Sequence, residues 1–306
     1  MRICYIQRLK EKSKMANLTK RQHYVPQFYL KNFCDSTGFL WGWDKLKKGI
    51  FKCATKDICQ SAFLYENELK NANPKCGKFI LPNSIENTLA NMEGEFSTCI
   101  SQVLQICRNP ANRDVLICSS KQKQILTKFA INMMLRNPVM LNGAYDVEYK
   151  SSAYSDLVDT GYEELVDLMG FGDLEPFFDY ALKLGLIDEK IKNSPANVFN
   201  SLISEMQFEI LKANGYSFVT ANCPVIFVGG HTSEENLLDY LSIPISPDFT
   251  LSYTREKLTR RNKIVELSPK ETLDINLQYA DSTAKLATQL YSNDKELLSF
   301  ISAYAK

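Results

Sequence analysis

Two stretches of helical periodicity in the middle of the chain restrict its fold more than any other feature. In the first, apolar residues recur every three or four positions after Asn83, a good N-cap residue, and Glu86 follows three positions later. Its apolar positions are Ile85, Leu89, Met92, Phe96, Ile100, Val103 and Leu104. The second stretch begins near Ser119 and runs to Arg136, where Asn-Pro at Pro138 ends it. Together they predict two adjacent amphipathic helices.

Strand-like segments flank this helical middle on both sides. Residues 23–65 alternate aromatic segments with polar turns and predict a hairpin or meander. A further helix is expected over residues 200–213, followed by strands, and the last part, 268–304, is expected to be helical. The expected strands are 216–220, 225–228, 241–248 and 250–253. The order β, α, β, α without regular alternation predicts an α+β protein.

In this α+β arrangement, the N- and C-terminal β segments form a shared mixed or antiparallel sheet. The mainly helical section, about 84–214, packs over that sheet. A chain of 306 residues with 45% apolar content can bury a large core, and we expect 15–306 to form a single integrated domain. Residues 1–14 are rich in Lys and Arg and precede a second methionine, so we expect a disordered or alternative-start extension.

Composition excludes several classes of protein. Thirty-six Lys and Arg balance 35 Asp and Glu, so the net charge of +1 gives no global attraction to nucleic acid or to anionic membranes. The apolar runs are far shorter than the roughly 20 residues of a membrane-spanning helix. Nine cysteines, an odd number without a CxxC pair, predict reduced thiols and a cytoplasmic location rather than a disulfide framework.

His23 is the first candidate for chemistry. It is one of only two histidines and lies three residues before Pro26, in an aromatic segment that ends at Phe33. Because imidazole changes charge near neutral pH, His23 could act as a general base or acid, or ligate a metal. The alternative is a buried structural histidine whose ring nitrogens bind backbone, with the neighbouring aromatics as core.

Two glutamates and an arginine form a second group. Glu86 and Glu93 are seven residues apart, which places them on nearly one helix face, about 20° apart. Arg136, three residues after Met133, falls on the buried-facing side of the second helix, where a charge is costly unless paired. We expect a bridge to Glu93 or Glu86, and it could be purely structural. If the glutamates and His23 instead share one cleft, they could hold a divalent metal and a hydrolytic water, with Arg136 meeting a phosphate oxygen.

Two further segments supply candidate substrate contacts. Asn222 lies in a loop between two expected strands, and its amide can donate and accept hydrogen bonds. Arg260 and Arg261 belong to the run 255–263, whose five positive charges against one negative could bind a phosphate backbone. Because this run lacks interleaved aromatics, a solvated surface is the alternative.

The ordered segments 23–33, 41–44, 136–138, 218–225 and 243–247 resemble the landmarks of the domain-of-unknown-function family 4238. The resemblance spans about residues 21–292. It implies no settled activity, although some members look like single-gene anti-phage defence cargo in bacteria and phage satellites. The family pattern has Thr-Ser-Asp-Asn-Pro-Val where this chain has 220–225. Asn222 therefore replaces a carboxylate that could bind a metal or serve as a base.

The resemblance implies a bacterial or prophage-borne antiviral protein. The candidate residues predict that this cytoplasmic protein acts as a metal-assisted phosphodiester hydrolase of the nuclease type. The residues assigned to these roles are His23, Glu93 and Arg136 for catalysis, Glu86 and Glu93 for Mg²⁺ or Mn²⁺, and Asn222, Arg260 and Arg261 for substrate binding. The alternative is a non-enzymatic sensor or binding protein that recognises a phage protein or a nucleic-acid component, in which the same polar residues lock the core. No membrane partner is expected.

Overall fold

The computed structural model of the chain describes residues 18–69, 77–109, 117–143, 195–231, 236–255, 263–281 and 286–304, with isolated positions between 155 and 184. The expected extension at 1–14 and the basic pair Arg260 and Arg261 lie outside the described residues. Most of the segment 144–194, expected to be helical, does so as well.

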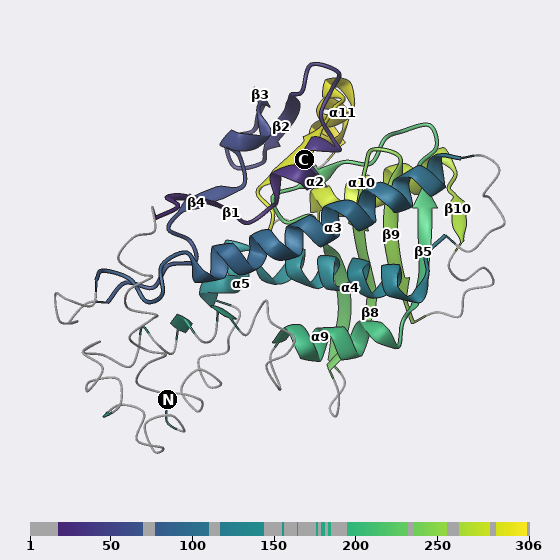
Figure 1. Ribbon diagram of the computed structural model, residues 1–306. Helices are drawn as coiled ribbons and strands as arrows, with labels where there is room; N and C mark the ends of the chain where they lie inside the picture. The colour runs from purple at the N-terminus through teal and green to yellow at the C-terminus, as the bar shows by residue number, and fades with distance from the viewer. Residues whose placement is uncertain are drawn as a thin grey trace.

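The two predicted long helices are confirmed and lie side by side across the molecule (Figure 1). They are α3 (Ser84–Arg108) and α4 (Ser120–Leu135), and the rings of Phe96 and Phe129 meet between them with centroids 5.6 Å apart. A capping box begins α4. The backbone N–H of Gln122 donates to Ser119 Oγ at 3.2 Å, and the backbone N–H of Ser119 donates to Gln122 Oε1 at 2.9 Å. A short helix, α5 (Pro138–Gly143), follows the Asn-Pro stop.

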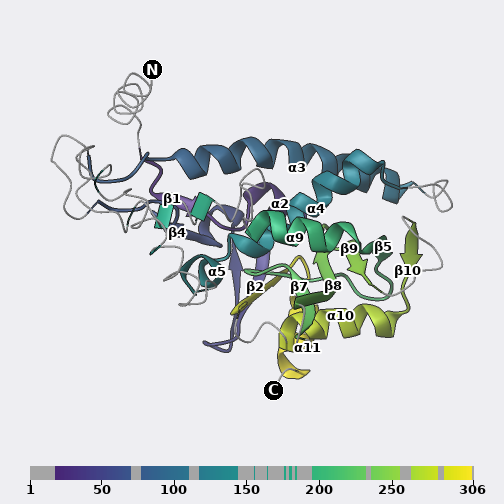
Figure 2. The same ribbon diagram turned by 90° about the horizontal axis from the view of Figure 1, so that it is seen from below.

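A mixed five-stranded sheet forms the centre of the larger part of the molecule. Its strand order is β10 (Ile264–Glu266), β5 (Gln207–Lys212), β9 (Phe249–Thr254), β8 (Asn236–Pro244) and β7 (Ile226–His231). The β10–β5 pair is parallel and the other pairs are antiparallel. Helices α3, α4 and α9 (Pro195–Ser204) cover one face, and α10 (Pro269–Asp281) covers the other (Figure 2). Every residue of β9 is buried because helices lie on both of its faces.

The helix expected over 200–213 is wrong in its second half, because α9 ends at Ser204 and β5 begins three residues later. Phe208 and Ile210 are buried, whereas the residues between and before them are half-buried, which is the period of two expected of a strand. Phe208 lies opposite Tyr253 of β9, with ring centroids 5.1 Å apart. Pairing with β9 therefore overrides the local helical preference of this segment.

A four-stranded sheet joins the two ends of the chain, as predicted. Its order is β3 (Gly49–Cys53), β2 (Leu40–Asp44), β11 (Gln289–Ser292) and β6 (Thr220–Ala221). The helical structure expected over 268–304 is present as α10 and α11 (Lys295–Tyr304), but the strand β11, which was not expected, lies between them. A four-residue strand carries too little periodicity to be recognised, and its antiparallel pairing with β2 and β6 places it there. Similarly, β6 covers only the end of the strand expected from residue 216.

A small antiparallel pair, β1 (Arg21–His23) and β4 (Gln60–Ala62), lies beside the N-terminal half of α3 and places His23 opposite Gln60. Between these strands the chain forms α2 (Gln27–Lys31) and the 3-10 turn η1 (Thr55–Asp57). In the part of the chain that the structure describes, no helix is long and apolar enough to cross a membrane.

Candidate functional site

A polar cluster is buried where β1 meets the adjoining parts of α3 and α4. We call it the Arg136 cluster, and its members are His23, Tyr65, Glu86, Glu93, Asn132 and Arg136. Arg136 follows the last residue of α4 and is only 1% exposed. An arginine so deeply buried needs partners in every direction in which its planar guanidinium donates.

The structure provides those partners from four segments. Arg136 Nη1 donates to Glu93 Oε1 of α3 at 2.7 Å and to Asn132 Oδ1, one turn earlier in α4, at 3.3 Å. Its Nε donates to the Tyr65 hydroxyl at 3.1 Å, and its Nη2 donates to the His23 carbonyl at 2.5 Å. The Tyr65 hydroxyl donates to the same carbonyl at 3.2 Å. The expected inter-helix bridge is therefore present, with Glu93 rather than Glu86 as the partner.

The aromatic residues that follow His23 in the sequence belong to the core. Tyr29 packs on Phe129 of α4 at 5.7 Å between centroids and on Phe33 at 5.3 Å, and its hydroxyl hydrogen-bonds Thr220 Oγ1 at 2.7 Å. The segment after Pro26 is thus a structural anchor. His23 itself lies before this segment, at the end of β1.

The His23 ring is half-buried and has one engaged and one free nitrogen. It hydrogen-bonds to the backbone of Lys56, whereas Nε2 is buried with no hydrogen-bond partner among the described residues. Burial lowers the pKa of His23 below its usual value, and the Lys56 bond and the charge of Glu93 partly offset this effect. His23 is therefore a neutral imidazole at neutral pH, with a lone acceptor or donor at Nε2.

Glu86 shows the opposite change in pKa. Burial raises the pKa of its carboxyl to about 7; the charge of Arg136 lowers it, and Glu93 and Glu66 raise it further. Its Oε2 atom is buried and, within the described residues, hydrogen-bonds to nothing. The Glu86 carboxyl therefore keeps its proton to a higher pH than an exposed glutamate does.

Asn222 connects to the cluster through the residue after Arg136. Asn137 Nδ2 donates to the Asn222 carbonyl at 3.2 Å. The Asn222 side chain accepts a hydrogen bond from the backbone N–H of Gln289 at 3.1 Å and donates to Thr288 Oγ1 at 3.3 Å. It also forms a hydrogen bond with the Tyr24 side chain. The amide that replaces the family's carboxylate thus ties the loop after β6 to β11.

The metal expected at Glu86 and Glu93 remains a prediction. The described residues contain no group of three or more His, Cys, Asp or Glu side chains arranged to hold a metal ion. One oxygen of Glu93 is engaged by Arg136, so the two glutamates offer few carboxylate oxygens to a cation. The pair by itself does not fit a divalent cation, which prefers several ionised oxygen ligands. The chemistry that the cluster can perform on its own is proton transfer.

Some members of this region were missed by reasoning from the sequence. Tyr65 lies in an irregular loop, and no periodicity marks it. Gln22 and Glu66 form a second buried polar pair, with Gln22 Nε2 donating to Glu66 Oε1 at 2.8 Å, and Glu66 also accepts from the Asn83 amide at 3.1 Å. Only Asn132 carried a usable signal, because it lies four residues before Arg136 and therefore on the same helix face.

The family model described as a protein of unknown function (DUF4238) matches residues 21–296. No curated protein and no solved structure matches the chain at a significant level.

Proposed function

Because this chain belongs to DUF4238, a family without a defined activity, its chemistry must be argued from its own residues, and we propose a phosphodiester hydrolase. The observation that carries this proposal is the pair His23 and Glu86. Each has a buried polar atom without a hydrogen-bond partner among the described residues, and the charge of Arg136 lowers the pKa of both side chains. Buried polar atoms are normally bonded, so two such atoms around one arginine favour a site that is completed by a ligand.

The pKa of His23 is lowered and the pKa of Glu86 is raised, which suits them to act as base and acid respectively. Burial keeps His23 neutral, so its Nε2 can accept a proton from an attacking water or hydroxyl. The raised pKa of Glu86 keeps a proton available for the leaving oxygen. Arg136 is a positioning residue in this scheme, because it holds the backbone carbonyl of His23 and the carboxylate of Glu93.

The choice of a phosphodiester rests on the resemblance to anti-phage defence cargo, because nucleic acid is what an infecting phage delivers. A bacterial defence role and a nucleic-acid substrate are therefore part of the proposal. If a metal contributes, it would need further ligands besides Glu86 and Glu93.

A second candidate is a non-enzymatic sensor that binds a phage or nucleic-acid component. The observation that favours it is the internal use of the predicted site residues. Arg136 is 1% exposed and donates to Glu93, Tyr65, Asn132 and the His23 carbonyl. In this case the cluster locks β1, α3 and α4 together, and recognition takes place on another surface.

The test compares purified His23→Gln and Glu86→Gln with the unmodified chain in cleavage of RNA and DNA, with Mg²⁺, Mn²⁺ or a chelator. Neither change removes a hydrogen bond of Arg136, because Arg136 binds residue 23 through the backbone carbonyl and pairs with Glu93 rather than with Glu86. The folded state, monitored by circular dichroism, should therefore persist. We expect each variant to lose about 10²-fold or more in rate.

The matched control is Glu95→Gln, an exposed change on the same helix, which should keep full activity. Full cleavage by both site variants would rule out the proposed chemistry. A chain that cleaves nothing under any of these conditions, yet protects cells from phage with His23→Gln in place, would favour the sensor.

A further inference from the structure

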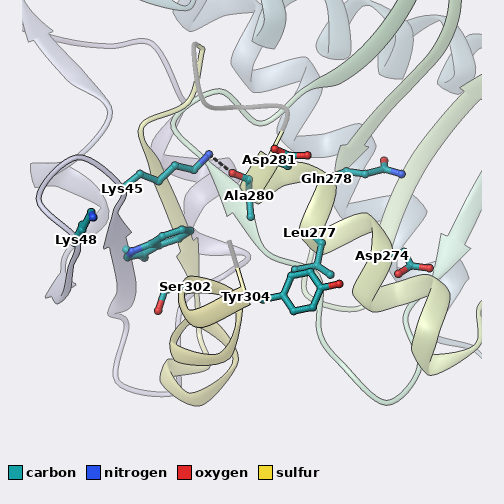
Figure 3. Close-up of a pocket in the computed structure, with 10 residues that line it drawn as sticks. Lys45, Lys48, Asp274, Leu277, Gln278, Ala280, Asp281, Ser302 and Tyr304 are labelled. Carbon is teal, nitrogen blue, oxygen red and sulfur yellow. Dashed lines mark hydrogen bonds between the residues drawn. The ribbon is translucent and has the colours of Figure 1, made fainter. Parts of the chain in front are cut away.

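A cavity of about 1140 Å³ opens between the turn after β2 and the C-terminal ends of α10 and α11 (Figure 3). Small-molecule sites commonly enclose about 300–1,000 Å³, so this cavity has room for a ligand of metabolite size. No member of the Arg136 cluster lines it, and the inference drawn from it is therefore independent of the proposed hydrolase.

One wall of the cavity carries two lysines on a fixed turn. Asp44 Oδ1 accepts from the backbone amides of Leu46 at 3.0 Å and Lys47 at 2.9 Å, and Gln289 Nε2 donates to Asp44 Oδ2 at 3.0 Å. These bonds hold the turn between β2 and β3 against β11. Lys45 and Lys48 both line the cavity from this turn.

Lys45 is held at the C-terminal end of α10. Its Nζ donates to the Ala280 carbonyl at 2.5 Å and to the Tyr279 carbonyl at 3.4 Å, which places its charge at the negative end of the helix. Burial lowers the pKa of Lys45 to about 8, and the charge of Asp281 partly opposes this effect. A bound anion would stabilise this partly desolvated ammonium ion further.

The remaining lining is suited to a planar ring with polar edges. Trp43 and Tyr304 line the cavity. Tyr304 is 68% exposed and offers its ring face, with Leu277 beside it, whereas Trp43 is 7% exposed and offers only a small part of its ring (Figure 3). Aromatic side chains bind planar rings by stacking. Asp274, on the α10 side, can accept hydrogen bonds from hydroxyl or amino groups.

We propose that this cavity binds a nucleoside monophosphate. The phosphate lies at Lys45 and Lys48, the base packs against Trp43 and Tyr304, and the sugar hydroxyls donate to the carboxylate of Asp274. Lys45 and Lys48 on one side and Asp274 on the other favour a ligand with its negative charge at one end. A triphosphate would bring negative charge towards Asp281 and is expected to bind less well.

The two tryptophans of the chain make the test direct. Trp41→Phe leaves Trp43 as the only indole, and its fluorescence is titrated with the four nucleoside 5′-monophosphates, adenosine, adenosine triphosphate and inorganic phosphate. We expect saturable quenching by at least one monophosphate and weaker binding of the other probes. Calorimetric titration of the unmodified chain provides the same comparison if Trp41→Phe does not fold.

Two variants test the contacts. Lys48 has a positive φ of 51°, so Lys48→Asn removes the charge with a residue that tolerates this backbone conformation, and we expect about tenfold weaker binding. Tyr304→Ala should weaken binding about fivefold through lost stacking. Lys47→Asn, at an exposed neighbour on the same turn that does not line the cavity, is the control and should leave binding unchanged.

Three results would overturn the proposal. The first is the absence of saturable binding of any monophosphate. The second is an affinity for phosphate alone, or for adenosine alone, equal to that for the monophosphate, because the base or the phosphate would then contribute nothing to binding. The third is unchanged affinity in both Lys48→Asn and Tyr304→Ala.

Discussion

Replacing Arg136 by methionine is expected to destabilise the protein by about 3 kcal/mol. Methionine keeps the apolar part of the side chain and removes the guanidinium, which is 1% exposed and donates to four acceptors. Removing one partner of a buried ion pair typically costs about 3–5 kcal/mol, because the other partner stays desolvated.

Two features of the cluster place the expected loss at the lower end of that range. The Glu93 side chain is 26% exposed, so water can reach its freed carboxylate. The His23 carbonyl keeps the hydrogen bond from the Tyr65 hydroxyl at 3.2 Å. The buried Asn132 also loses a partner without local replacement, and this opposing effect keeps the expected loss within that range.

Urea unfolding followed by circular dichroism measures the effect. A loss of about 3 kcal/mol corresponds to a midpoint lower by about 1 M for an m-value near 3 kcal/mol/M. Arg136→Lys should restore little of the lost stability, because an ammonium ion cannot donate to all of the acceptors that the planar guanidinium reaches. Arg108→Met, at an exposed arginine in the last turn of α3, is the control and should change stability by about 0.5 kcal/mol or less.

A double-mutant cycle with Glu93→Gln should give a coupling energy of about 1–2 kcal/mol. The reasoning is refuted if Arg136→Met lies within about 1 kcal/mol of the unmodified chain at an unchanged m-value. In that case the buried bonds would contribute no net stability.

Two further substitutions probe the cluster and the smaller sheet. The pKa of Glu86 is about 7 in the folded chain and 4.5 for an ordinary glutamate, so the free energy of unfolding should fall as pH rises through this interval. Glu86→Gln should flatten the decline in urea midpoints with pH. An unchanged slope would contradict the pKa shift. Gly42→Ala should cost about 1–2 kcal/mol in the same assay, because its Cβ would lie 2.5 Å from the Phe51 ring opposite it on β3. Gly94→Ala, in open space on α3, should instead stabilise by about 0.5–1 kcal/mol, and equal effects at the two glycines would refute the steric argument.

Local patterns predicted the features that depend on neighbours in the chain. The helices α3 and α4 follow from apolar spacing and from the signals at Ser119 and Pro138, and their existence implied that a buried Arg136 needs a glutamate from the facing helix. The ion pair with Glu93 confirms that inference at 2.7 Å. A charge in a core allows few solutions, which is why a contact between positions 43 residues apart could be expected from the sequence.

Only the tertiary structure decided the rest. The strands β5 and β11 are too short or too ambiguous to be recognised locally, and their hydrogen-bond partners on β9 and β2 determine their conformation. The same holds for the site: Tyr65 enters the Arg136 cluster from a loop without periodicity, and the cavity joins the turn after β2 to the ends of α10 and α11. Helical periodicity relates residues only three or four positions apart, so the sequence reveals it directly. Burial, pKa values and cavities instead depend on segments brought together from distant parts of the chain.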